Sequence, residues 1–238
     1  MVFFGRKRRK EQEAAATNAV STDEAVAEVP ELEPATTGPF DVADVPGREQ
    51  RLDLGAIWLP GAQGIELRME VDKKTQRITG VAVALNGSIL QLQAFAAPRT
   101  EGIWDEIRDE ISQSIQKQGG MVDDVPGELG RELLVRLPVK MPDGKDGVQP
   151  ARFVGFDGPR WFLRGVFSGR ASFDKAAAKE LEAIFRNVVV IRGDEARAPR
   201  DLLELTLPGG VRPTQLPEET APEIGNPLKR GPEITQIG

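Results

Sequence analysis

Apolar and charged residues alternate strictly over residues 65–71, which are Ile-Glu-Leu-Arg-Met-Glu-Val. Because successive side chains of a strand point to opposite faces, this pattern predicts a strand with one buried face. Other apolar runs bounded by Gly, Pro and Asn predict further strands. These strands are expected over residues 51–60, 78–85, 88–96, 133–139, 151–156, 160–168, 188–191 and 202–207.

Two glycine-containing turns predict hairpins. Asn86-Gly87 is the stronger signal, because both loop residues of a type I′ turn need positive φ. With these residues as the loop, Val83 lies opposite Leu90 and the strands share one apolar face. Asp157-Gly158 predicts a second hairpin of the same kind between residues 151–156 and 160–168.

Helical periodicity occurs twice. Ile103, Ile107, Ile111 and Ile115 recur every fourth residue, after a capping Thr100 and before Gly119-Gly120. The second helix is expected after Asp174, which is a good N-cap residue. Its apolar stripe consists of Ala177, Ala178, Leu181, Ile184 and Phe185.

These elements predict an α+β fold, a mainly antiparallel sheet with two helices packed on one face. Each half of the core gives strands, a hairpin and then a helix, so a β-β-β-α pseudo-repeat is an alternative description. The core is expected to be a single domain over residues 47–207. Residues 1–46, basic and then acidic, and residues 208–238, rich in proline, are predicted to be disordered tails.

The chain contains no His, Cys or Tyr. This composition excludes a thiol nucleophile, a Ser-His-Asp triad and metal sites with nitrogen or sulfur ligands. Carboxylate pairs at Asp105/Asp109 and Glu106/Glu110 have the spacing to chelate a hard cation, but a solvated helix face is the favoured interpretation. We therefore predict no catalytic residues, no metal site and no cofactor, and lean towards a protein that is not an enzyme.

The N-terminal residues place Phe3 and Phe4 before a basic cluster at 6–10, an order that does not suit a secretory signal. No run approaches the roughly 20 apolar residues that a spanning helix needs. We expect a cytoplasmic protein. Weak peripheral contact of the basic cluster with anionic lipid is an alternative to its being simply solvated, and the net charge of −6 disfavours binding of bulk nucleic acid.

The strand expected over residues 160–168 carries the candidate site. Its alternation places Trp161, Leu163 and Phe167 on a core face. The other face carries Arg160, Phe162 and Arg164, and this interleaving of guanidinium and aromatic groups suits a carboxylate, a phosphate or a stacked base. The favoured alternative is that the arginine stems cover an apolar strip.

Three stretches resemble an uncharacterised domain family of actinobacterial proteins. They are Asp-Gly-Pro-Arg-Trp-Phe-Leu-Arg-Gly-Val-Phe-Ser-Gly at 157–169, Ala-Pro-Arg-Thr-Glu-Gly-Ile-Trp-Asp-Glu-Ile-Arg at 97–108 and Arg-Leu-Asp-Leu-Gly at 51–55. The resemblance covers about residues 47–207. It implies a single domain but no reaction, cofactor or catalytic residue.

Function is therefore expected to lie in binding. Two helices on one face would leave the other face of the sheet in need of cover, and its apolar residues would be Ala82, Ala84, Ile89, Phe95, Phe162 and Val166. This predicts a non-catalytic protein-interaction or scaffold domain, whose partner is another protein or a second copy. The alternative is a module that binds an anionic ligand or single-stranded nucleic acid through Arg160, Phe162 and Arg164.

Overall fold

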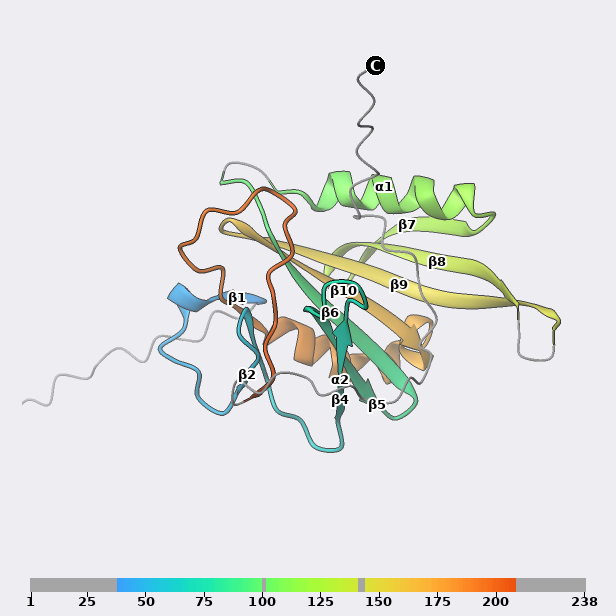
Figure 1. Cartoon of the computed structure of the whole chain (residues 1–238). Helices are drawn as coiled ribbons and strands as arrows, with labels where there is room; N and C mark the ends of the chain where they lie inside the picture. Colours follow the sequence, from blue (N-terminus) through green and yellow to red (C-terminus); the bar gives the residue numbers. More distant parts are fainter. Residues whose placement is uncertain (1–37, 100–101, 141–143, 209–238) are drawn as a thin grey trace, which may run out of the picture. The chain divides into compact units, whose positions relative to one another are not determined.

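A computed structural model describes residues 38–99, 102–140 and 144–208. A seven-stranded antiparallel sheet dominates, with strand order β4-β5-β6-β10-β9-β8-β7 (Figure 1). Its strands are β4 (Glu66–Val71), β5 (Ile78–Leu85), β6 (Ser88–Ala96), β7 (Met121–Gly127), β8 (Gly130–Lys140), β9 (Asp146–Gly158) and β10 (Trp161–Gly169). The helices are α1 (Trp104–Lys117) and α2 (Lys175–Arg186), with short 3-10 turns η1 (Val42–Asp44) and η2 (Arg170–Ser172). The predicted α+β class, mainly antiparallel, is confirmed.

A second, small sheet has the order β1-β11-β3-β2. Its strands are β1 (Phe40–Asp41), β2 (Leu52–Asp53), β3 (Ile57–Leu59) and β11 (Val189–Val190). The predicted start of the domain at residue 47 is therefore too late. Asp41 also accepts a hydrogen bond of 2.6 Å from Trp161 Nε1, so a contact across 120 positions of the chain fixes this segment, and no local periodicity signals it.

The β5–β6 hairpin has the predicted register, with Val83 opposite Leu90 and Leu85 opposite Ser88. Asn86 and Gly87 have φ values of 50° and 75°, as a type I′ turn requires. Here the local turn chemistry alone determines the pairing.

The β9–β10 hairpin turns two residues later than predicted. Gly158 pairs with Trp161, so the loop is Pro159-Arg160, and Arg160 takes a positive φ of 65°. Proline suits the first of two turn residues because its φ is already near −65°. Asp157 thus belongs to the strand, and Arg160 does not.

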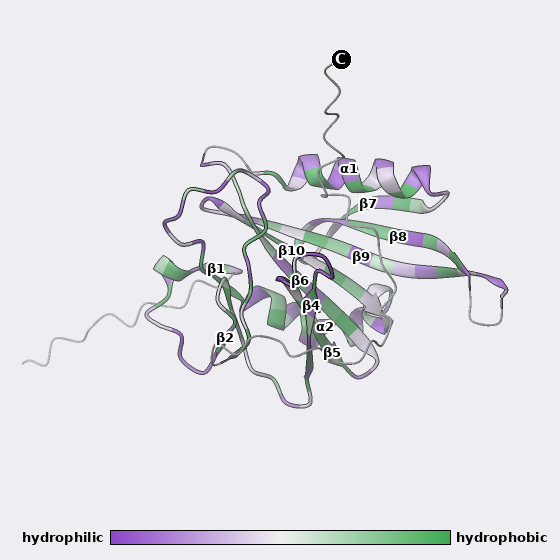
Figure 2. Ribbon diagram, viewed as in Figure 1, coloured by the Kyte–Doolittle hydropathy of each residue, from purple (hydrophilic) through white to green (hydrophobic). Residues whose placement is uncertain are grey.

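The two helices cover opposite faces of the large sheet, so the prediction of two helices on one face is wrong. Along β10, Trp161 and Phe167 pack in the core with α2, whereas Phe162 and Val166 pack in the core with α1. Figure 2 shows α1 with its hydrophobic side towards the sheet and hydrophilic residues outward. We name the two faces after these helices, the α1 side and the α2 side.

Both halves have the element order β-β-β-α, as β4-β5-β6-α1 and β8-β9-β10-α2, but this arrangement excludes a pseudo-twofold relation between them. The sheet order runs outward symmetrically from the β6–β10 pair, which is antiparallel. A twofold axis that exchanges two antiparallel neighbours is perpendicular to the sheet, and it would keep both helices on one face. The second half moreover adds β7, a strand over residues that the sequence suggested to be a loop.

In the described part of the chain, no helix is long and apolar enough to cross a membrane. The basic cluster at 6–10 and the proline-rich segment from residue 209 onward lie outside the described residues. The same is true of Thr100, the predicted cap of α1.

Candidate functional site: the open half of the α1-side face

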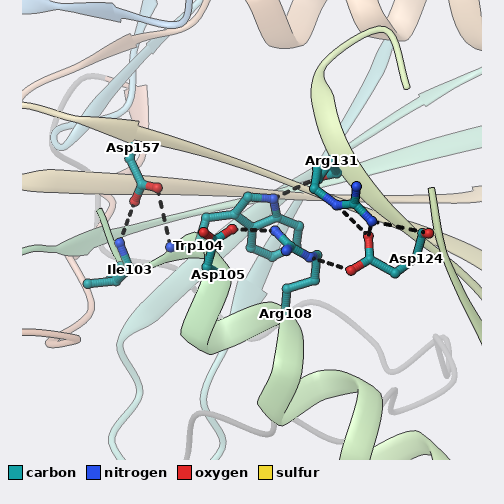
Figure 3. A network of polar contacts seen from close by, with 7 residues as sticks. All are labelled: Ile103, Trp104, Asp105, Arg108, Asp124, Arg131 and Asp157. Carbon is teal, nitrogen blue, oxygen red and sulfur yellow. Dashed lines mark hydrogen bonds and ion pairs between the residues drawn. The ribbon is translucent and has the colours of Figure 1, made fainter. Parts of the chain in front are cut away.

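Helix α1 is held by a carboxylate from β9. Asp157 accepts hydrogen bonds from the backbone N–H groups of Ile103 (2.8 Å) and Trp104 (3.3 Å), so it caps the first turn from a distant strand (Figure 3). Trp104 donates from Nε1 to the carbonyl of Arg131 (2.8 Å). Its ring lies over Gly155, where a Cβ atom would collide with it. These contacts fix the N-terminal end of α1 above β8 and β9.

Ion pairs fasten the rest of the helix. Arg108 bridges Asp105 (2.6 Å) and Asp124 (2.9 Å), and Asp124 also binds Arg131 (Figure 3). Both glutamates of the predicted carboxylate pair, Glu106 and Glu110, contact a single arginine, Arg200, at 2.7 Å. Among the described residues, no group of three or more acidic side chains is placed to hold a metal ion.

Helix α1 contacts β7, β8 and β9, and the face over β4, β5 and β6 extends beyond it. We call this region the open half-face. The cross-strand register places its side chains in two rows, each with one residue from β4, one from β5 and one from β6. The first row is Glu66, Ala84 and Ile89, and the second row is Arg68, Ala82 and Gln91. All of them except Ala82 are half-buried or exposed. A hollow of about 280 Å³ is lined in part by Glu66, Arg68, Ala84 and Ile89.

A third row, at the border of the open half-face, carries buried charge. Glu70 lies opposite Gly80, and Gln93 lies opposite Arg164, so the row crosses β4, β5, β6 and β10. The lack of a side chain at Gly80 leaves space for the Glu70 side chain, because a Cβ atom at Gly80 would lie 2.8 Å from the Glu70 carboxylate and 2.9 Å from Gln93. The acid therefore extends over the strand towards the guanidinium.

The match to known families covers most of this fold. The family model described as "Protein of unknown function (DUF3710)" matches residues 38–214. The chain belongs to the DUF3710 family. No curated protein matches it. The matched region begins at the first described residues, in agreement with the structural start of the domain.

Arg164 is the unusual residue of this DUF3710 domain. It is 6% exposed, and its Nη2 donates to the side-chain oxygen of Gln93. Its Nε and Nη1 have no acceptor, and it forms no ion pair with a described carboxylate. Burial lowers the pKa of Arg164 to about 10, an effect that the negative charge of Glu70 opposes. Burial likewise raises the pKa of Glu70, against the influence of Arg164 and of a hydrogen bond from Gln91.

Only one of the three predicted site residues remains a candidate for binding. Phe162 is 0% exposed and stacks on Trp104 at 5.7 Å, so no base can reach its ring. Arg160 lies in the hairpin turn and donates to the Gly193 carbonyl. Arg164 shares its face with Phe162 as predicted, but Arg160 is not part of that row because the hairpin turns two residues later.

A second buried charge cluster of the DUF3710 domain lies on the α2 side and escaped the sequence interpretation. Arg152 forms ion pairs with Glu182 (2.6 Å) and Glu132 (3.4 Å), and its guanidinium lies 4.2 Å from the ring of Phe167. Burial raises the pKa of Glu132. A charged residue flanked by Ala151 and Phe153 within an apolar strand was the available signal.

Proposed function

We propose that this DUF3710 domain is a non-catalytic protein-interaction domain and that the open half-face is its binding surface. The observation that carries the proposal is the unequal cover of the α1 side. Helix α1 covers one half of that face, while Ala84, Ile89 and Gln91 on the other half are only half-buried. Small and amide side chains of this kind suit a partner that packs flat on the sheet.

Arg164 supports the same surface. A buried guanidinium that leaves two donors without acceptors costs free energy. Both nitrogens lie beneath the surface, so a carboxylate or carbonyl oxygen of a partner would recover this free energy only when neighbouring side chains move aside. Its row adjoins the open half-face, so such a group would arrive together with the contacts to Gln91 and Ile89.

The alternative of an anionic ligand or single-stranded nucleic acid rests on Arg164 alone, because Phe162 is sealed. We favour a protein partner for this reason. The expected compartment is the cytoplasm, which the lack of cysteine suits.

The proposal is tested by affinity capture with the full chain and two glutamate variants. Ile89→Glu adds a charge to the open half-face, and Val148→Glu adds the same charge at a site on the α2 side that is 64% exposed. We expect proteins captured by the unmodified chain to be lost with Ile89→Glu and retained with Val148→Glu. Equal capture by both variants, with both folded by circular dichroism, would reject the open half-face as the binding surface.

A further inference from the structure

Strand β4 ends the large sheet and presents a free edge. It pairs with β5 only, and no other described strand lies beside it (Figure 1). The Thr79 hydroxyl donates to the carbonyl of Glu70, so the backbone groups of Glu70 face β5. Because backbone direction alternates along a strand, the N–H and C=O groups of Leu67, Met69 and Val71 face outward. The pairing of β4 with β5 has one irregularity, between Glu70 and Val71. An unpaired edge of this kind is a template for another strand.

The side chains of β4 are complementary to themselves. Glu66, Arg68 and Glu70 alternate in charge on the α1 side, while Leu67, Met69 and Val71 lie on the α2 side. Leu67 is one of the few large apolar residues with high exposure, at 36%. An antiparallel copy of the same strand would therefore meet both opposite charges and apolar neighbours.

Charge and strand length together select one register for such a pair. With Met69 opposite Met69 of the second copy, Leu67 lies opposite Val71 and Arg68 lies opposite Glu70, twice by symmetry. The Glu70 carboxylate extends over β5 towards Arg164, so the Arg68 guanidinium of the second copy would have to reach it from the edge of the sheet. All outward backbone groups of Leu67, Met69 and Val71 then find partners. Moving the centre to Arg68 would set arginine against arginine and Glu66 against Glu70, which is unfavourable. Moving it to Leu67 would keep Glu66 opposite Arg68 but would pair only residues 66–68 of β4, so length and charge together favour Met69.

We propose that two copies of this chain associate through β4 in the register centred on Met69. The twofold axis of an antiparallel pair is perpendicular to the sheet, so both α1 sides face the same way. The two open half-faces then join into one floor that contains β6, β5 and β4 from each copy, with an α1 helix beyond each end. At about 4.8 Å per strand the floor is roughly 30 Å wide. The pairing deepens the proposed function, because it doubles the proposed binding surface.

Single cysteines test the register, since the chain has none of its own. In the full chain, Met69→Cys should crosslink to itself through a short bismaleimide. Leu67→Cys and Val71→Cys should each fail alone and crosslink to one another when mixed. Efficient crosslinking of Leu67→Cys to itself, with none for Met69→Cys, would overturn the proposed register.

Sedimentation equilibrium of the full chain tests the association itself. We expect a concentration-dependent dimer whose dissociation constant rises about tenfold or more with Arg68→Glu, which sets glutamate against Glu70 at two symmetric positions. Lys179→Glu, the same reversal on the outer surface of α2, should leave the constant unchanged. A monomer at all concentrations, or a dimer insensitive to Arg68→Glu, would reject the pairing. Neither result would affect the capture experiment with Ile89→Glu, which does not depend on β4.

Discussion

Strands β9 and β10 carry two buried arginines whose side chains leave opposite faces of one sheet. On the α2 side, Arg152 lies between the carboxylates of Glu132 and Glu182. On the α1 side, Arg164 has one amide oxygen and no ion pair with a described carboxylate. The first guanidinium is ion-paired within the fold, although its Nε, like that of Arg164, has no hydrogen-bond acceptor, and the second borders a surface that α1 leaves open. Equal burial of two like residues therefore does not imply an equal role.

Arg152→Met should break the ion-paired cluster on the α2 side and should cause the largest loss of stability among these variants. Removal of the cation leaves Glu132 and Glu182 buried without compensation, which costs about 3–5 kcal/mol of unfolding free energy. Urea denaturation measures the loss. Arg170→Met is the matched control, since its pair with Asp174 is exposed and should contribute little to stability. Equal losses for the two variants would show that the Arg152 cluster is not structural.

Asp157→Ala tests whether the covered half of the α1 side depends on its cap. Two backbone N–H groups at the start of α1 lose their acceptor, which we expect to cost about 1–2 kcal/mol. Hydrogen exchange should show faster exchange at the N-terminal end of α1 and little change in α2. Unchanged protection of α1 would mean that Trp104 and the ion pairs position the helix without Asp157.

Arg164→Met should change the free energy of unfolding by no more than about 1 kcal/mol in either direction. The variant loses the hydrogen bond to Gln93, but it also removes a buried charge with two unpaired donors. Glu70, whose pKa burial already raises, then becomes neutral more readily. A loss as large as that of Arg152→Met would remove the contrast between the two clusters.

Glu70→Gln should show the smallest effect, a difference in stability from the unmodified protein that depends on pH. Because the pKa of Glu70 is higher in the folded than in the unfolded state, the folded protein holds the proton more tightly. The unmodified protein therefore loses stability relative to the variant as pH rises from about 4.5, the unfolded value, through the folded pKa. Between pH 4.5 and 7, the denaturation midpoint of Glu70→Gln should rise relative to that of the unmodified protein. Glu66→Gln, on the same strand, controls for the removal of a charge. A constant difference over this range would show that the burial of Glu70 does not govern its titration.

The sequence predicted correctly those elements whose formation depends on neighbouring residues in the chain. Asn86-Gly87 determines its own hairpin, and the isoleucines of α1 need only helical spacing. The assignment of helices to faces failed because residues 161–167, apart from Arg164, have no polar side chains, and all of them are buried. A strand buried on both faces is typical of a sheet with cover on each side. That signal was present in the chain.

For the site, the sequence identified Arg164 but not its environment. Glu70 and Gln93 come from strands far away in the chain, and only the sheet order places them in one row with Arg164. The same holds for Asp157, whose role as the cap of α1 depends on a contact across 54 positions. Tertiary pairing of this kind is not encoded in any local pattern.

Photo-crosslinking is the most direct test of the open half-face as a binding surface. A photoreactive phenylalanine analogue replaces Gln91 on this surface or, as a control, Phe173, which is 70% exposed outside it. We expect a discrete crosslinked protein from position 91 that disappears when Ile89→Glu is added, and no such product from position 173. The same product from both positions, or its persistence with Ile89→Glu, would contradict the assignment of binding to the open half-face.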